Sequence, residues 1–270
     1  MKRKSLAVIG VGNMAKAIIN GILDVGFPLN SIYLYDVNIA QSSSIVASNV
    51  YISESIKEAV SSADSVLISV KPQNYNEVLD RISETPSYRD KLYISIGAGI
   101  STDYIKDRLG DVAVLRVLPN LPIVIGKGVS VICRSNSVDT DDFKFVVDIF
   151  SSAGSVIDID ESQMNPIIGV TSSSPAYVFK FIEAICEGAA LQGIDSPALK
   201  TAVCDMIIGS ALMLRESDRS PSELVSAVAS KGGTTERAIS KLNEYDFSKG
   251  IVEAMKACTA RADELGAKKE

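Results

Sequence analysis

A short apolar run at the start of the chain passes directly into a glycine-rich turn. Leu6–Ile9 is the run, and residues 10–15 read GVGNMA, which has the spacing G-x-G-x-x-A and opens a helical pattern. In this pattern the first glycine makes a tight turn, the second lets the backbone approach a pyrophosphate, and the small third residue permits close helix packing. The context predicts a dinucleotide-binding domain, with a ligand-free turn as the alternative.

The first half of the chain alternates strand-like and helix-like segments. Strands are expected over Leu6–Ile9, Ile32–Tyr35, Ser65–Val70, Leu92–Ile96, Val112–Val117, Gly128–Ile132 and Ser155–Asp158, and helices over Met14–Leu23, Asn74–Ile82 and Asp139–Phe150. Short connections between alternating strands and helices predict an α/β fold with a parallel, doubly wound sheet of the Rossmann type.

Strand signals stop after about residue 160. Three serine–proline pairs, Ser174-Pro175, Ser196-Pro197 and Ser220-Pro221, each place a capping hydroxyl before a proline at an expected first helical position. Glu223 adds a capping box to the third pair. We therefore expect a dinucleotide-binding domain over 1–159 and an all-helical domain over 160–270, with a solvated tail at 268–270.

Composition excludes several function classes. The net charge of −6 argues against nucleic acid or an anionic membrane as a partner. No apolar run suits a membrane span or an export signal, and the four cysteines are widely spaced like reduced thiols, so we expect a cytoplasmic protein. The chain has no histidine, which excludes His-based triads and most zinc sites, and no metal site is expected. Chemistry must depend on a cofactor, a hydroxyl, a lysine, a tyrosine or a carboxylate.

Asp36 ends the second expected strand, where an acidic side chain accepts hydrogen bonds from the ribose hydroxyls of a dinucleotide. The alternative role is a helix cap. Its charge should repel a 2′-phosphate, because two unit charges about 4 Å apart cost about 4 kcal/mol at an effective dielectric of 20. No arginine follows in Val37-Asn38 to offset this, so NADH is favoured over NADPH.

Three further segments end strands at the carboxyl edge of the expected sheet, where ligands of doubly wound folds bind. They are Val70–Gln73, Gly97–Gly99 and Leu118–Pro122. Each alone could be only a turn. Together with the glycine fingerprint they predict a nicotinamide cleft.

A second glycine loop lies in the helical half, where residues 231–235 read KGGTT before a helical pattern. Two glycines and two hydroxyls leave backbone N–H groups free to converge on a small anion at a helix N-terminus. The loop thus predicts a carboxylate or phosphate site, with a plain turn or cap as the alternative.

These motifs together resemble those of the pyrroline-5-carboxylate reductase family. The similar segments are GVGNMA at 10–15, VKPQ at 70–73, GAGIS at 97–101, RVLPNLP at 116–122, SSSPAYVF at 172–179 and GGTTERAISKLN at 232–243. The resemblance implies NAD(P)H-dependent reduction of L-1-pyrroline-5-carboxylate to L-proline, the last step of proline biosynthesis. It also implies a Rossmann domain followed by a helical dimerisation domain, with homodimers formed through C-terminal helices and, further, rings of dimers such as a decamer.

The resemblance also implies roles for individual residues. Gly10, Gly12, Asn13 and Met14, with Ala15 of the same turn, would hold the cofactor phosphates, and Val70, Lys71, Pro72, Ala98 and Asn120 would line the nicotinamide end. Ser230 and the amides of Gly232, Gly233 and Thr234 would clamp the substrate carboxylate across the dimer interface. Thr235 would hydrogen-bond the ring nitrogen, and Lys231 would either assist the carboxylate or point to water.

Three positions depart from the family pattern: Ser172, where glycine is usual; Lys231, where proline is usual; and Ile56, where asparagine is frequent. Two other functions stay open. A β-hydroxyacid dehydrogenase shares the layout but uses a lysine on the first C-terminal helix, and here no lysine precedes Lys180 in that region. A nucleotide-binding regulator without turnover is the second. Related imines such as piperideine carboxylates also stay open as substrates.

Overall fold

The chain forms two compact units in a computed structural model, which describes residues 4–267. One unit comprises Met1–Ser173 with Met255–Glu270, and the other comprises Ser174–Ala254. The expected solvated tail at 268–270 lies outside the described residues. The division falls later in the chain than the boundary expected after residue 159, because Met164 and Ile168 pack into the core of the first unit.

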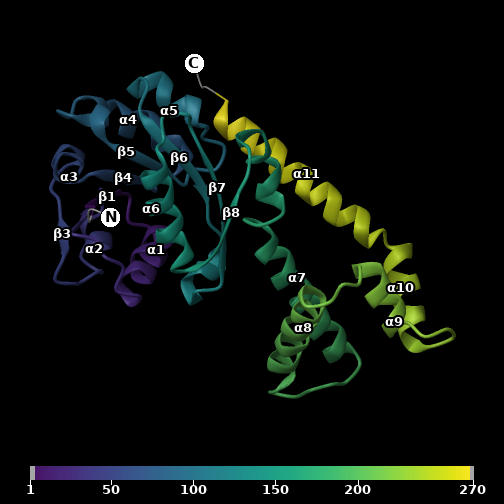
Figure 1. Ribbon diagram of the computed structural model, residues 1–270. Coiled ribbons are helices and arrows are strands. Elements are labelled where there is room, and N and C mark those ends of the chain that lie inside the picture. Colours follow the sequence, from purple (N-terminus) through teal and green to yellow (C-terminus); the bar gives the residue numbers. More distant parts are fainter. Residues whose placement is uncertain (1–3, 268–270) are drawn as a thin grey trace. The chain divides into compact units, whose positions relative to one another are not determined.

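The first unit is built on one sheet in which the chain order reverses between β1 and β4 (Figure 1). Its strands are β1 (Leu6–Ile9), β2 (Ile32–Tyr35), β3 (Val50–Ile52), β4 (Ser65–Ile68), β5 (Leu92–Ser95), β6 (Ala113–Leu118), β7 (Gly128–Arg134) and β8 (Gly154–Asp158). They lie in the order β3-β2-β1-β4-β5-β6-β7-β8. The mostly parallel, doubly wound fold predicted from the sequence is confirmed.

Two features of the sheet differ from the expectation. β6 and β7 pair antiparallel, because only the short 3₁₀ helix η3 (Leu121–Ile125) joins them, and a parallel crossover needs a dozen residues or more. β3, an edge strand of only three residues, was not predicted. A strand of this length is too short for an alternating pattern to identify.

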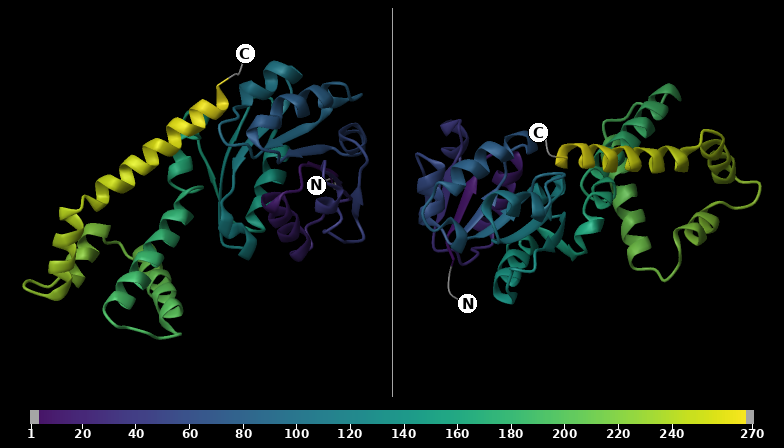
Figure 2. Two further views of the ribbon diagram at one scale, coloured as in Figure 1. Left: turned by 180° about the vertical axis from the view of Figure 1, so that it is seen from behind. Right: turned by 90° about the horizontal axis from the view of Figure 1, so that it is seen from above.

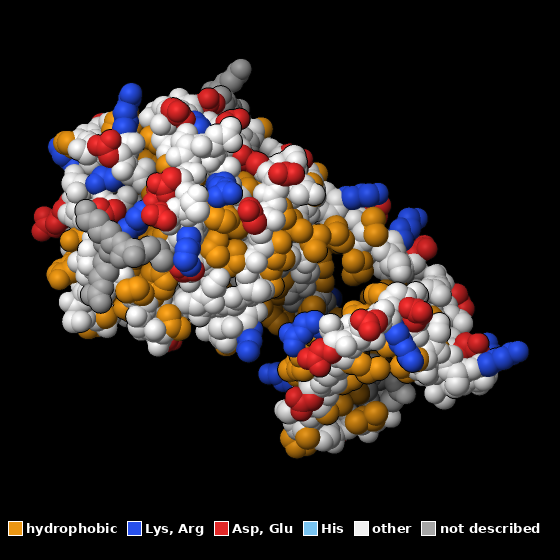
Figure 3. Space-filling view, in the orientation of Figure 1, with side chains coloured by type: hydrophobic (Ala, Val, Ile, Leu, Met, Phe, Trp, Pro, Cys, Tyr) orange, Lys and Arg blue, Asp and Glu red, His pale blue; other side chains and the backbone are white. Residues whose placement is uncertain are grey.

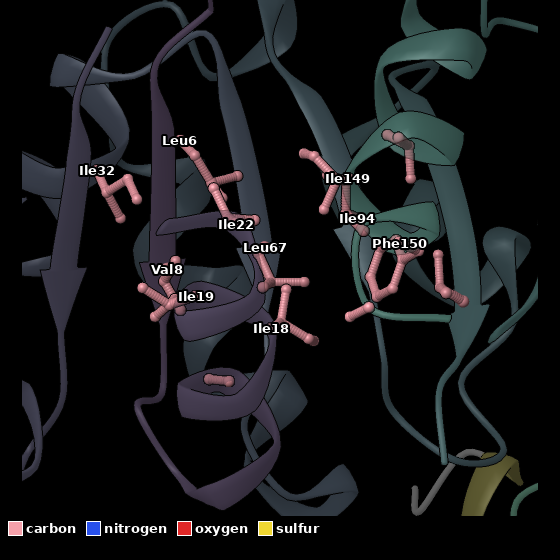
Figure 4. Close-up of a cluster of buried hydrophobic side chains, with 14 of the residues drawn as sticks. Leu6, Val8, Ile18, Ile19, Ile22, Ile32, Leu67, Ile94, Ile149 and Phe150 are labelled. Carbon is pink, nitrogen blue, oxygen red and sulfur yellow. The ribbon is translucent and has the colours of Figure 1, made fainter. Parts of the chain in front are cut away.

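Helices cover both faces of the sheet. One face carries α1 (Asn13–Asp24) and α6 (Thr140–Ser151), and the other carries α3 (Ile56–Ser62), α4 (Tyr75–Ser83) and α5 (Thr102–Leu109); the short α2 (Ile39–Ser42) follows β2. Figure 4 shows Ile18, Ile19 and Ile22 of α1 among side chains of the strands. Because β1 is buried on both faces, Leu6 and Val8 join one hydrophobic cluster and its alternate residues join the other.

Local capping explains where several helices begin. The carboxylate of Asp139 accepts a hydrogen bond from the N–H of Asp142 at 2.7 Å, as a helix starting there requires. The hydroxyl of Ser101 accepts from the N–H of Tyr104 at 3.0 Å at the start of α5. α3 and α5 were not among the helices expected from the sequence, although each begins at a serine cap.

The second half of the chain is helical, as predicted. Its helices are α7 (Ser174–Leu191), α8 (Leu199–Arg215), α9 (Pro221–Val228), α10 (Thr234–Glu244) and α11 (Phe247–Gly266), and α11 is one unbroken helix in Figure 2. The capping box of Ser220 and Glu223 is confirmed. The start expected at Ser196-Pro197 is wrong: α8 begins at Leu199, and the Ser196 hydroxyl instead accepts from the N–H of Ala198 at 3.3 Å in the preceding turn.

Within the described part of the chain, no helix combines the length and the apolar character that crossing a membrane requires.

Candidate functional site

A cleft of about 370 Å³ opens at the carboxyl ends of β1 and β4, the point at which the strand order reverses. Ligands of doubly wound folds bind at this position. Five of the residues expected to bind the cofactor line it: Gly10, Gly12, Asp36, Val70 and Lys71. The structure therefore brings the glycine fingerprint, the end of β2 and the end of β4 together in one place.

The glycine turn leaves room for a ligand on one side only. Gly10 has φ +89°, and a Cβ there would lie 2.9 Å from the carbonyl oxygen of Ser69 and 2.8 Å from Val70. A Cβ on Gly12 would meet nothing within 4 Å, so that position faces open space. Among the described residues no side chain caps α1, which begins at Asn13, so the N–H groups of its first turn suit an anion. The turn fits a pyrophosphate.

Asp36 holds this turn against the end of β2. One carboxylate oxygen accepts a hydrogen bond from the N–H of Val11 at 2.7 Å, and the other accepts from the N–H of Asn38 at 2.8 Å. Asn38, and not Asp36, caps α2, so the helix-cap alternative for Asp36 is wrong. Each carboxylate oxygen has a further lone pair, which leaves Asp36 able to accept a ribose hydroxyl.

Sequence reasoning missed two charged residues of the cleft. Glu77 and Arg81, one turn apart on α4, both line it, and their side chains form an ion pair at 3.0 Å. Neither residue lies in Val37-Asn38, the segment directly after Asp36 where an offsetting cation would be expected. Because α4 follows β4 at the same edge of the sheet, its position in the expected topology is the signal that could have found them. Ile56 also lines the cleft and is buried, so this departure from asparagine lies at the candidate cofactor site.

The expected nicotinamide residues lie along the same edge. Pro72 opens the 3₁₀ helix η1 (Pro72–Asn74) after Lys71, and Ala98 follows β5. Asn120 follows β6 and is buried; its amide oxygen accepts from the N–H of Val129 at 2.8 Å, and its nitrogen donates to the carbonyl of Thr171 at 3.0 Å. Both the oxygen and the nitrogen of this side chain therefore bind backbone groups, and Asn120 links the end of β6 to the backbone at Val129 and Thr171.

The loop at residues 230–235 belongs to the other unit and leads into α10, which begins at Thr234. Gly232 has φ +74°, and its N–H donates to the carboxylate of Glu236 at 2.7 Å. The N–H of Gly233 donates to the carbonyl of Ser230 at 2.9 Å. The expectation that these two N–H groups are free is corrected, because Glu236 reaches back from the first turn of the helix and the loop closes a tight turn. The roles of the loop residues toward a substrate stay predictions.

The remaining donors of the loop lie at the start of α10. Among the described residues no side chain caps this helix, whose first two residues are Thr234 and Thr235. Thr235 is half-buried, whereas Ser230, Lys231 and Thr234 are exposed in the single chain. A helix N-terminus with two adjacent hydroxyls suits a small carboxylate.

Ser172, another departure from the family pattern, carries a buried hydroxyl. Its oxygen has no hydrogen-bond partner within the part of the chain that the structure describes. An unpaired buried hydroxyl costs about 1–3 kcal/mol, so this serine is a destabilising replacement for glycine unless a ligand or partner satisfies it.

No group of three or more His, Cys, Asp or Glu side chains in the described residues is arranged to hold a metal ion.

Residues 5–99 match the family described as NADP oxidoreductase, coenzyme F420-dependent, and residues 161–265 match the family described as pyrroline-5-carboxylate reductase dimerisation. The sheet, the open glycine turn and the first match define an NAD(P)-dependent oxidoreductase with a Rossmann-type domain. The pyrroline-5-carboxylate reductase of Haemophilus influenzae is 34% identical over 268 residues, which cover 98% of each chain. This chain belongs to the pyrroline-5-carboxylate reductase family.

Two further similarities point to the same family. The pyrroline-5-carboxylate reductase of Escherichia coli is 33% identical over 265 residues, 97% of this chain and 98% of that one. The crystal structure of the Plasmodium falciparum pyrroline carboxylate reductase, which has NADP bound, superposes with a TM-score of 0.90 at 26% identity and covers 99% of this chain and all of that one.

Proposed function

We propose that this protein reduces L-1-pyrroline-5-carboxylate to L-proline with NADH or NADPH, as the last step of proline biosynthesis. The observation that carries the proposal is the similarity over 98% of the chain to an enzyme of that name. The open glycine turn at the start of α1 and the threonine pair at the start of α10 supply the two binding sites that the reaction needs.

The reaction suits a chain without histidine. A protonated cyclic imine is already electrophilic, so no strong protein acid is required. A reduced nicotinamide, when bound, supplies the hydride. The protein's own part is to bind and align: the start of α10 with Thr234 and Ser230 holds the carboxylate, and the hydroxyl of Thr235 hydrogen-bonds the ring nitrogen. The amides of Gly232 and Gly233 join the carboxylate only after they leave their present partners.

NADH is the preferred cofactor in this proposal. Asp36 lies in the cleft and repels a 2′-phosphate, and the positive charge of Arg81 is already paired with Glu77. We expect wild-type protein to bind NADH more tightly than NADPH, and Asp36→Ala to shift the ratio of the two Kd values at least about tenfold toward NADPH. If instead wild type prefers NADPH and Arg81→Gln removes that preference, Arg81 holds the 2′-phosphate and the proposal for Asp36 is wrong.

The same proposal includes a homodimer formed through the helices of the second unit, with further assembly into rings such as a decamer. Exposed apolar side chains are numerous on these helices: Val178, Phe179, Phe181, Met206, Ile208, Leu212, Met213, Val225, Val228 and Val252. Figure 3 shows orange side chains gathered where Figure 1 places α8. Apolar surface of this extent is typical of an interface between subunits. No disulfide joins the four cysteines in the described part of the chain, which fits a reducing compartment, so the proposed location is the cytoplasm.

A spectrophotometric assay separates the open functions. NADH oxidation is measured with pyrroline-5-carboxylate and with a piperideine carboxylate, and NAD⁺ reduction is measured with β-hydroxyacids. We expect rapid turnover with pyrroline-5-carboxylate and none with hydroxyacids. Turnover of hydroxyacids alone would identify a β-hydroxyacid dehydrogenase, and cofactor binding without any turnover would identify a nucleotide-binding regulator.

A further inference from the structure

The loop that follows β5 is held from two sides through its glycines. A Cβ on Gly97 would lie 2.7 Å from the ring of Tyr75, a fully buried residue of α4. Gly99 has φ +79°, and a Cβ there would collide with the backbone carbonyl oxygen of Ala262 in α11. Gly97 therefore packs against a side chain, and Gly99 packs against the backbone of α11.

The contact with α11 is reciprocal. A Cβ on Gly266, the last residue of α11, would collide with the carbonyl oxygen of Gly99. Two glycines thus face each other, and neither position has space for even a methyl group. Glycine in this arrangement lets two backbones approach more closely than any other residue would allow.

Packing and hydrogen bonds fix the end of α11 in this position. Ala262 is buried and packs in one hydrophobic cluster with Ala98 and Cys258. The amide nitrogen of Asn165 donates to the carboxylate of Asp263 at 2.6 Å, and its oxygen accepts from the buried guanidinium of Arg116 at 2.5 Å.

A carboxylate completes the arrangement at the other end of the loop. Glu161 accepts hydrogen bonds from both the N–H and the hydroxyl of Thr102, at 2.7 and 2.5 Å, where α5 begins. Glu161 lies 3.9 Å from Arg116, so the same guanidinium lies between the start of α5 and the end of α11. The segment 97–102 is thereby held at three points: Gly97 packs against Tyr75, Gly99 packs against the backbone of α11, and Thr102 donates to Glu161.

We propose that the last turn of α11, Ala262–Gly266, is a positioning element that fixes the loop Gly97–Gly99 for the nicotinamide end of the cofactor, with Gly266 and Asp263 as its positioning residues. The proposal rests on the proposed function and on the expectation that Ala98 lines that end. The last turn of α11 and this loop belong to the same unit, and their backbones are in direct contact. The contact therefore sets the position of the loop's backbone, and hydride transfer depends on placement of its partners to within about 1 Å.

The first test measures binding without any imine. ADP-ribose contains the adenosine, pyrophosphate and second ribose but lacks nicotinamide, so the ratio of its Kd to that of NADH reports the nicotinamide end alone. In Gly266→Ala we expect the Kd of NADH to rise about tenfold while the Kd of ADP-ribose stays within about twofold. Gly250→Ala is the matched control, since the same substitution in the same helix meets nothing within 4 Å and should change neither constant.

Two binding results would overturn the inference: equal changes in both Kd values for Gly266→Ala, or no change in either. Because the measurement requires no turnover, its failure can be distinguished from a failure of the proposed reaction. A protein that gives the expected ratio but does not reduce pyrroline-5-carboxylate keeps this inference and refutes the function.

The second test separates positioning from loss of folded protein. In Gly266→Ala we expect kcat to fall about 10- to 100-fold with little change in KM for the imine, and the primary isotope effect with 4-deuterated NADH to increase. A variant that merely unfolds in part would lower kcat with an unchanged isotope effect, and that result contradicts the inference.

A milder variant covers the case in which Gly266→Ala does not fold. Asp263→Ala removes the acceptor of Asn165 and should change the same ratio in the same direction, whereas Asp263→Asn keeps an oxygen acceptor and should restore it. If Asp263→Asn behaves like the alanine variant, the hydrogen bond is not what positions the loop, and Asp263 is removed from the proposal.

Discussion

Two carboxylates in this chain each bind a backbone N–H of a glycine turn, with opposite consequences for ligands. Asp36 takes the N–H of Val11 and leaves the first turn of α1 for a pyrophosphate. Glu236 takes the N–H of Gly232 next to the proposed substrate carboxylate. The carboxylate of Glu236 stabilises the start of α10, but it competes with an anionic ligand for the N–H of Gly232.

Replacement of Glu236 should therefore improve substrate binding. In Glu236→Gln we expect KM for pyrroline-5-carboxylate to fall about threefold with kcat nearly unchanged, because a negative charge beside the incoming carboxylate is removed. The measurement is a steady-state titration at low ionic strength. Glu244→Gln, at the far end of the same helix, is the control and should leave KM unchanged. An unchanged or higher KM in Glu236→Gln would place the substrate carboxylate elsewhere.

The hydroxyl of Thr235 should matter for turnover and not for the cofactor. In Thr235→Ala we expect kcat to fall at least about tenfold while the Kd of NADH stays constant, since the hydrogen bond to the ring nitrogen strengthens as the imine becomes an amine. Thr235→Ser keeps the hydroxyl and should retain most of the rate. A wild-type kcat in the alanine variant removes Thr235 from the mechanism.

The positions of five cleft residues could be predicted from sequence, but their hydrogen-bond partners could not. Gly10 and Gly12 were located by a motif whose spacing reflects backbone geometry, and Asp36 by its place at the end of an expected strand. The bond from Gly232 to Glu236 was missed because it depends on how a five-residue turn closes, which side-chain spacing does not specify. Arg81 was missed because its place in the cleft depends on the packing of α4.

The strands and helices of the first unit bury several ionisable groups that must stay neutral. Burial raises the pKa of the Cys133 thiol in β7 to about 12 and raises the pKa values of Tyr75 and Tyr93 above their ordinary value. The Tyr93 hydroxyl donates to the carbonyl of Tyr88 at 2.7 Å, and that of Tyr75 donates to the carbonyl of Ile68 at 3.0 Å. These groups carry a proton in the folded state at a pH where the unfolded chain has lost it.

This burial predicts an alkaline loss of stability. A group whose folded pKa is raised contributes its full stability below its unfolded pKa, which is 9.0 for the thiol, and loses it as pH rises toward the folded value of about 12. Urea unfolding at a series of pH values should therefore show the free energy of unfolding falling above about pH 9. Cys133→Ala should be less stable at every pH but show a shallower decline, and an identical slope would contradict the burial of this thiol.

Element prediction succeeded where a pattern was long and failed where it was short. The seven expected strands all exist, because short segments rich in β-branched and aromatic residues between turn residues are distinctive. β3 and the antiparallel direction of β7 were not predictable from such runs, since pairing is a tertiary property. Pro197 does not start α8, because the Ser196 hydroxyl accepts a hydrogen bond from Ala198 within the turn that precedes the helix.

The division of the chain shows how its two proposed binding sites are distributed. The cofactor cleft lies entirely in the first unit and the loop at 230–235 lies in the second. The sequence predicted an α/β half and a helical half, yet it did not predict that the end of α11 returns to the first unit. A long amphipathic helix has no local signal that says which of two cores its last turns join.

The apolar surface of the second unit predicts that a single chain is not the stable form. Wild-type protein should sediment as a dimer or a larger assembly, and the double variant Phe179→Glu/Ile208→Glu should shift it toward monomer, because two charges would be buried without partners. Phe179→Leu/Ile208→Val keeps the surface apolar and is the matched control. Analytical ultracentrifugation decides, and a wild-type protein that stays monomeric at high concentration would refute the proposed dimer.

Transfer of a labelled hydride is the measurement that tests the proposed reaction most directly. The protein is incubated with pyrroline-5-carboxylate and NADH deuterated at C4 of the nicotinamide, and the product is analysed by mass spectrometry. With both C4 hydrogens of the NADH replaced by deuterium, we predict proline that carries one deuterium at C5, formed in step with the NADH consumed. Proline without the label, or NADH oxidised with no proline formed, would contradict direct hydride transfer to the imine by this protein.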